Sequence, residues 1–259
     1  MRFNELRFQV DKEGCAVIPF PQKIRHEMAE YVRERLSQTY PPSTTTRSID
    51  ERITETLCSI PDAPYSKSFL KPFRVFPNSF AENILSWFNQ EMVSILGWKK
   101  AWSHSIRPSE LRPDLGAHRN SYDCYWRCVR PFKNDTGYVH SDLHFWKLDE
   151  SQNNLPFECK EGTRWKMWIP ILGCTPQNSL QWIPGTHHEN IPYEFTDTVN
   201  GKRPTISESW IQARTPEFFT PVNGSDCNAM FFHDGIAHRA MMNEGTIIRV
   251  SAEITLIQG

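Results

Sequence analysis

The second half of the chain consists of short segments in which apolar and polar residues alternate, and this period of two restricts the possible folds most strongly. The segments begin at residue 121 and are separated by turn residues such as Asp234-Gly235. Alternation places successive side chains on opposite faces of a strand, and several short strands joined by turns are typical of antiparallel sandwiches and barrels. We therefore predict a mainly β protein with a barrel core over residues 121–257.

The first half of the chain predicts helices that flank this barrel. Residues 22–38 place apolar side chains at helical spacing. Residues 78–98 predict a second helix, because Ser79 and Glu82 have the spacing of a capping box and Gly97 is placed to end the helix. Both helices are expected to be scaffold elements without a chemical role.

The chain of 259 residues is long enough for one such domain, which we assign to residues 1–259, with the helical part over 1–120. Its net charge of -1 gives no reason to expect nucleic acid or an anionic membrane as a partner. It contains neither an apolar signal-peptide core at its start nor a run of about 18 apolar residues. Its scattered cysteines predict reduced thiols, so we expect a cytoplasmic protein that acts on a small-molecule substrate.

Two histidines flank an aspartate in "YVHSDLHFW", residues 138–146. If this segment is a strand, His140, Asp142 and His144 point to the same face. Positions two apart lie about 6.6 Å apart and can converge on one ion, whereas positions four apart lie about 13 Å apart. The local metal-binding pair is therefore either His140 with Asp142 or Asp142 with His144, and a third ligand must come from elsewhere.

The third ligand is expected in the last part of the chain. His238 lies between the turn at Asp234-Gly235 and a second turn at 243–245. A hairpin about the second turn would place His238 opposite Arg249 on the final strand, within one residue. His233 is the rival ligand, but it lacks this spacing from an arginine.

These residue types together indicate a particular chemistry. Two histidines and one carboxylate on one face of an iron ion leave coordination positions open, as in non-haem Fe(II) oxygenases. The open positions can chelate the 2-oxo acid end of 2-oxoglutarate and accept dioxygen. The far carboxylate of 2-oxoglutarate then needs a cation that binds it in a bidentate manner, which arginine does better than lysine. His140, Asp142, His238 and Arg249 fit these roles.

Three segments resemble, in the same order, the phytanoyl-CoA dioxygenase-like family of Fe(II)/2-oxoglutarate oxygenases: "HSD" at 140–142, "WIPILGCTPQNSLQWIPGTHH" at 168–188 and "HRAMMNEGTIIRVS" at 238–251. The resemblance implies a double-stranded β-helix, which is a cupin-like jelly-roll barrel. It also implies that His140, Asp142 and His238 bind iron and that Arg249 binds the far carboxylate of 2-oxoglutarate.

Two further residues are assigned to the co-substrate. Trp168 matches by position the tryptophan that the family has beside 2-oxoglutarate, and Ser251 shares the polar face of the last strand with Arg249. The chain departs from the family pattern at Ser179, where glycine is usual, and at Ala240, where a hydroxyl can assist 2-oxoglutarate. These departures predict a differently shaped co-substrate pocket and leave the three metal ligands intact.

The function predicted from the sequence is that of an Fe(II)- and 2-oxoglutarate-dependent dioxygenase that hydroxylates an aliphatic C–H bond of a small or medium-sized metabolite. Halogenation is disfavoured, because related halogenases lack the carboxylate that Asp142 supplies here. The first alternative is a zinc-dependent hydrolase or isomerase on the same barrel, in which Arg249 has no required role. The second is a protein that binds a metal or 2-oxoglutarate without turnover.

A locally basic stretch over residues 104–133 bears on the substrate. It is either a solvated surface or a rim whose arginines bind an anionic group of the substrate. Strand alternation allows at most one of Arg127 and Arg130 to point inward, and His144 is expected to be a neighbour of the site rather than a ligand. The candidate substrate residues are Arg127, Arg130 and His144, followed by Arg107, Arg112 and Arg119.

Overall fold

The computed structural model describes residues 3–41, 47–62, 65, 71–103, 124–151, 163–198, 201–220 and 228–259. The helices are α1 (Phe3–Glu13), α2 (Gln22–Thr39), α3 (Ile49–Cys58), α5 (Asn78–Glu91), α6 (Val93–Leu96), α7 (Asp142–Ser151) and α8 (Glu208–Arg214). The strands are β1 (Cys15–Pro19), β2 (Ala101–Trp102), β3 (Cys124–Val129), β4 (Arg164–Leu172), β5 (Leu180–Trp182), β6 (Tyr193–Thr198), β7 (Gly201–Ile206), β8 (Asn228–His233), β9 (His238–Ala240) and β10 (Arg249–Gln258).

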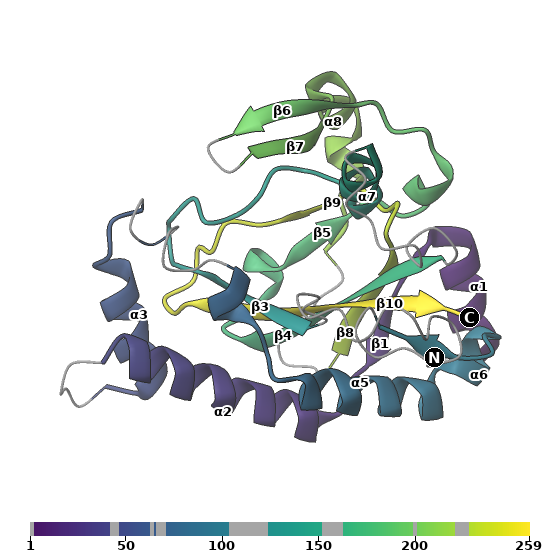
Figure 1. Ribbon diagram of the computed structural model, residues 1–259. Coiled ribbons are helices and arrows are strands. Elements are labelled where there is room, and N and C mark those ends of the chain that lie inside the picture. The colour runs from purple at the N-terminus through teal and green to yellow at the C-terminus, as the bar shows by residue number, and fades with distance from the viewer. Residues whose placement is uncertain are drawn as a thin grey trace.

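A six-stranded antiparallel sheet forms the larger wall of the molecule. Its order is β1-β8-β4-β10-β2, and β3 also pairs with β10. Helices α2 and α5 lie along one face of this sheet (Figure 1). The small sheet of β5 and β9 lies over the other face, and the β6–β7 hairpin with α8 lies farther out on that side (Figure 1). The predicted mainly β jelly-roll barrel with flanking helices is confirmed.

Strand β10 shows why the alternation in the sequence was informative. Val250, Ala252 and Ile254 lie on one face and are 0% exposed, in the core that the sheet shares with the flanking helices. The opposite face carries Arg249 and Ser251, which are also buried because this face looks into the barrel. Strand β10 pairs with other strands at both edges and is buried on both faces, so its polar side chains can point into the barrel interior.

An aromatic cluster fills the space between the helices and the sheet. The rings of Trp165 and Phe231 are stacked with centroids 4.9 Å apart, and Phe88 of α5 contacts Phe231. Trp98 completes the cluster against Trp165 and Phe231. The aromatic residues that the sequence contains in large number thus serve the scaffold as well as the site.

The predicted ends of the second helix are partly wrong. Its N-cap residue is Pro77, which has no side-chain cap, so the capping box expected from Ser79 and Glu82 does not form. Gly97 does end the helical segment, with φ of 73° in the left-handed region. The segment is also interrupted at Met92, between α5 and α6.

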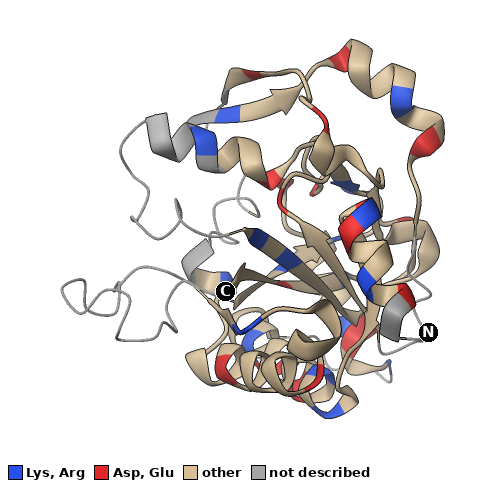
Figure 2. Cartoon of the chain, turned by 90° about the vertical axis from the view of Figure 1, so that its right-hand side faces the viewer, with Lys and Arg blue, Asp and Glu red and all other residues tan. Residues whose placement is uncertain are grey.

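Charges of both signs are spread over the helices at the surface, and basic residues also occur on strands of the main sheet (Figure 2). Basic residues occur on three of these strands: Arg127 on β3, Arg164 and Lys166 on β4, and Arg249 on β10. A search of the described residues finds no helix with the length and apolarity that a membrane crossing requires.

A strained backbone position gives a prediction about stability. Phe132 has φ of 55°, which lies in the left-handed region. Its side chain is 68% exposed, and its backbone N–H donates a hydrogen bond to the Asn243 carbonyl. A residue with a Cβ atom in the left-handed region is destabilised by roughly 1–2 kcal/mol, and glycine avoids this strain. Glycine is more flexible in the unfolded chain, and this entropy cancels about 0.5–1 kcal/mol of the gain. We expect Phe132→Gly to raise the free energy of unfolding by about 0.5–1 kcal/mol in a denaturant titration. Phe132→Ala is the control, and an equal gain there would contradict backbone strain as the cause.

Candidate metal centre

Two histidines are brought together by a backbone pairing that the sequence did not predict. His140 forms an isolated antiparallel bridge with His238 of β9. The His140 N–H donates to the His238 carbonyl over 3.1 Å, and the His238 N–H donates back to the His140 carbonyl over 2.9 Å. The two imidazole rings consequently lie with their centroids 4.3 Å apart.

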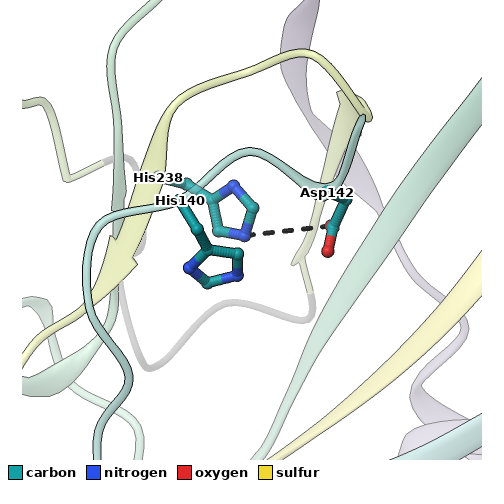
Figure 3. A group of neighbouring side chains, drawn as sticks. All are labelled: His140, Asp142 and His238. Carbon is teal, nitrogen blue, oxygen red and sulfur yellow. Dashed lines mark ion pairs between the residues drawn. The ribbon is translucent and has the colours of Figure 1, made fainter. Parts of the chain in front are cut away.

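The expected strand over 138–146 is wrong, because the chain leaves the extended conformation after His140 and begins α7 at Asp142. The β8–β9 turn holds this helix start. The carbonyl of Asp234 accepts hydrogen bonds of 2.9 Å from the Leu143 N–H and from the Ser141 hydroxyl. Because of this change of direction, Asp142 turns toward His238 (Figure 3).

His140, Asp142 and His238 form a compact group of possible metal ligands (Figure 3). One ligand atom from each residue lies within 4.8 Å of the others, and Asp142 Oδ2 is 3.9 Å from His238 Nε2. Among the described residues, no other group of three or more His, Cys, Asp or Glu residues has this geometry. The group supplies two nitrogens and one carboxylate oxygen, the donor set of a facial triad.

Backbone carbonyls set the orientation of both imidazoles. Nδ1 of His140 lies 2.7 Å from the Tyr138 carbonyl oxygen, and Nδ1 of His238 lies 2.9 Å from the Ile236 carbonyl oxygen. A carbonyl oxygen can only accept, so Nδ1 carries the proton in both rings and Nε2 presents its lone pair. This is the tautomer that a metal ligand bound through Nε2 requires.

Ionisation also favours cation binding. Burial, together with the neighbouring His238, lowers the pKa of His140 to about 4, so its ring is neutral near pH 7. Burial alone would raise the pKa of Asp142, but Lys166 and the two histidines outweigh burial and lower it. The group therefore contains neutral imidazole and a carboxylate, the states in which these side chains bind metals.

A pocket adjoins the two histidines of the group. His140, His238, Trp168, Arg249 and Ser251 line it, together with Arg127, Val129, Asp135, Thr136, Gly137, Leu180, Ala240 and Glu253. The expected hairpin between His238 and Arg249 is wrong, because β9 pairs with β5 whereas β10 pairs with β3 and β4. The two residues instead approach the same pocket from opposite sheets.

Arg249 has the environment of an anion-binding residue. Its side chain is 1% exposed, and Nη1 donates to the Met241 carbonyl over 3.1 Å. Within the described residues, its Nε and the Ser251 hydroxyl are buried without a hydrogen-bond partner. Burying such groups unpaired is costly, so an arginine and a hydroxyl in one pocket fit an anionic ligand such as a carboxylate.

Arg127 and Arg130, the arginines of the basic stretch that the structure describes, have different surroundings, as strand alternation predicted. Arg127 lines the pocket, and its side chain remains 45% exposed. Arg130 is 0% exposed and is bound to Asp135, Asp62 and the Ile60 carbonyl. The prediction that Arg130 contacts the substrate is therefore wrong, because its guanidinium is consumed by the scaffold. Arg107, Arg112 and Arg119 lie outside the described residues.

The remaining candidate histidines lie outside the pocket. His144 is buried and stacks on Tyr193 with ring centroids 3.8 Å apart, so it is not placed to touch a substrate in the pocket. His233 accepts a hydrogen bond at Nδ1 from the Gly235 N–H over 2.9 Å. Neither belongs to the group of possible metal ligands.

Sequence reasoning missed a charge network beside Asp142. Lys166 Nζ lies 3.9 Å from Asp142 Oδ2. Glu253 accepts hydrogen bonds from the Tyr125 hydroxyl over 2.6 Å and from Arg127 Nε over 2.8 Å. A signal was present, since Lys166 is a charged residue within the otherwise apolar residues 165–172 of β4 and Glu253 lies on the polar face of the last strand.

The buried His144 and the half-buried His187 and His233, which lie outside this group, predict how stability depends on pH. Burial, as the largest cause, lowers the pKa of His144, His187 and His233 to about 4 from 6.5. Between these values the unfolded chain binds more protons than the folded protein, so stability falls as the pH falls. Asp234, whose pKa burial raises to about 6, acts in the opposite direction but is a single group.

We therefore expect the melting temperature to decrease steadily between pH 6.5 and pH 4. His144→Gln should make this decrease shallower, because it removes one contributing group. A melting temperature that is constant or rises over this range would contradict the assignment of neutral, buried histidines.

No protein-family model and no curated protein matches the chain. Solved structures with a similar fold are found. EctD from S. alaskensis, determined with 2-oxoglutarate and 5-hydroxyectoine, is 13% identical with a TM-score of 0.54, over 98% of this chain and 75% of that chain. EvdO2 from Micromonospora carbonacea var. aurantiaca, complexed with 2-oxoglutarate, is 11% identical with a TM-score of 0.52, over 99% and 91%.

A third similar structure is SnoK, a non-heme alpha ketoglutarate dependent carbocyclase from nogalamycin biosynthesis. It is 12% identical with a TM-score of 0.54, over 98% of this chain and 83% of that chain. At these identities the similarity establishes the fold. The chain is thus a jelly-roll barrel of the kind found in these proteins, with a His-Asp-His group beside its internal pocket.

Proposed function

We propose that the protein is an Fe(II)- and 2-oxoglutarate-dependent dioxygenase. The observation that carries this proposal is one pocket lined by both histidines of the His-Asp-His group and by the buried Arg249, whose Nε has no hydrogen-bond partner among the described residues. The donor set suits Fe(II), and Arg249 with the Ser251 hydroxyl suits a carboxylate. The similar fold of EctD and EvdO2, both determined with 2-oxoglutarate, supports the same assignment.

Each residue has a definite part in this proposal. His140, His238 and Asp142 would hold the iron, and Arg249 with Ser251 would bind the far carboxylate of 2-oxoglutarate. Trp168, which is 2% exposed, would pack against the co-substrate and keep water from that end of the pocket. Iron bound there would supply dioxygen activation coupled to oxidation of 2-oxoglutarate to succinate and carbon dioxide.

The reaction proposed is hydroxylation of an aliphatic C–H bond. Asp142 is in place and turned toward His238, so no ligand position is left for a halide in its stead. A zinc-dependent hydrolase would leave the buried cation Arg249 without a role. We also propose a cytoplasmic location, in keeping with the free cysteines among the described residues.

The substrate is proposed to be anionic, with Arg127 as the residue that binds its charged group. Arg127 lines the pocket, and Glu253 holds it through Nε, which fixes the guanidinium at the rim. A hydrogen bond between charged groups contributes roughly 1.5–3 kcal/mol, so Arg127→Gln should raise the substrate KM by about tenfold or more. The dependence on 2-oxoglutarate should stay nearly unchanged. Arg203→Met, an exposed arginine on β7, serves as the matched control.

The direct test is succinate formation from 2-oxoglutarate with ferrous iron, assayed across a library of anionic and neutral metabolites. Turnover that requires both iron and 2-oxoglutarate, and that an anionic compound stimulates, is the expected result. Hydrolysis or isomerisation of a library compound with zinc alone would contradict the proposal. Stimulation by neutral compounds only would contradict the role of Arg127.

A further inference from the structure

Lys166 of β4 is buried inside the barrel, where it is 7% exposed. Lysine is rarely buried unless a charged partner compensates it. Lys166 is therefore a positive charge held next to a proposed metal ligand, at 3.9 Å from Asp142 Oδ2.

The same carboxylate oxygen faces both Lys166 and the ligand histidine. Asp142 Oδ2 is the oxygen that lies 3.9 Å from Lys166 Nζ and also the oxygen that lies 3.9 Å from His238 Nε2. A separation of 3.9 Å is too long for a hydrogen bond. Lys166 therefore acts on this oxygen through its charge and does not fix the direction of the carboxylate.

Glu253 cannot fully neutralise Lys166, although it lies in the same network. Its carboxylate already accepts hydrogen bonds from Arg127 Nε over 2.8 Å and from the Tyr125 hydroxyl over 2.6 Å. Arg127 thus compensates Glu253, and among the described residues Asp142 is the carboxylate that forms an ion pair with Lys166. A divalent cation at the triad would share that partner, so cation and ammonium would repel each other at short range in a partly buried site.

We propose that Lys166 weakens metal binding at the triad and makes full metal affinity depend on the dianionic co-substrate. This inference rests on the proposed function. Binding of 2-oxoglutarate adds negative charge next to the metal and offsets the repulsion by Lys166. Because coupling between two ligands is reciprocal, the metal and 2-oxoglutarate strengthen each other's binding, and Lys166 increases the size of that effect.

The test is a calorimetric titration with Mn(II), which substitutes for Fe(II) without redox chemistry and needs no turnover. Without 2-oxoglutarate, Lys166→Met should bind Mn(II) at least about tenfold more tightly than the wild-type protein. Added 2-oxoglutarate should strengthen Mn(II) binding by a larger factor in the wild type than in Lys166→Met. Lys166→Arg, which keeps the charge, and Lys147→Met, which removes an exposed lysine of α7, should both resemble the wild type.

The outcomes separate this inference from the proposed function. A wild-type protein that fails to bind Mn(II) would contradict the metal site itself. A wild type that binds Mn(II) together with a Lys166→Met variant of equal or weaker affinity would overturn the role of Lys166 alone. If Lys166→Met and Lys166→Gln fold only when Mn(II) is supplied, the metal replaces the missing charge and the inference is supported. If both remain unfolded with Mn(II), Lys166 is a packing residue and the inference is overturned.

Discussion

Asp142→Ala is expected to abolish metal binding at the triad and all turnover that depends on it. The substitution removes the carboxylate of the group and leaves His140 and His238 in the orientation set by their backbone partners. Loss of a residue that merely supports a ligand costs about 10–100-fold in metal affinity, and loss of a ligand should cost more. Titration with Mn(II) measures this loss without turnover.

Two controls make this prediction specific. His144→Ala should keep metal binding, because His144 stacks on Tyr193 and is not part of the group of possible ligands. His238→Ala should lose metal binding, whereas His233→Ala should retain it. The reverse result for the last two variants would show that the third ligand is His233 and that the metal site has been misassigned.

Arg249→Leu is expected to weaken 2-oxoglutarate binding strongly while leaving metal binding nearly intact. Arg249 is 1% exposed and lines the pocket together with Ser251, and among the described residues its Nε and the Ser251 hydroxyl have no hydrogen-bond partner. Removing one partner of a buried, charge-assisted contact costs roughly 2–5 kcal/mol. The dissociation constant of 2-oxoglutarate, measured with Mn(II) present, gives this cost directly.

The loss of 2-oxoglutarate affinity should depend on which contact with the co-substrate is removed. Arg249→Lys should lose part of the affinity, because an ammonium cannot form the bidentate contact of a guanidinium. Trp168→Ala should weaken binding less than Arg249→Leu, since it removes packing against the co-substrate and leaves the charge in place. Unchanged 2-oxoglutarate affinity in Arg249→Leu would remove this residue from the co-substrate site.

The sequence predicted the barrel because alternation in its strands reports which face is buried. Val250 and Ile254 lie in the core as expected, and Arg249 and Ser251 face the interior pocket. The same local rule failed at residues 138–146, where hydrogen bonds from the distant Asp234 carbonyl hold the start of α7. Local periodicity contains no information about such a contact.

The pairing of strands that are distant in the sequence could not be predicted from the sequence. Short turn-separated strands near the C-terminus were assigned to a hairpin, but β9 pairs with β5 and thereby joins the smaller sheet of the barrel. His238 and Arg249 still meet at one pocket, for a reason different from the one predicted. Lys166 was missed because a charged residue near the start of a largely apolar strand does not show which carboxylate it faces. The assignment of residues 1–259 to one domain stays a prediction.

The central claim is that one pocket binds Fe(II) and 2-oxoglutarate together, and anaerobic absorption spectroscopy tests it most directly. Ferrous iron and 2-oxoglutarate added together, without dioxygen, should give the weak visible charge-transfer band of a 2-oxo acid chelated to iron. Neither component alone should give the band, and Asp142→Ala should lack it. If the wild-type protein binds Fe(II) and 2-oxoglutarate but shows no band, the two do not meet at one site, and the proposed function is contradicted.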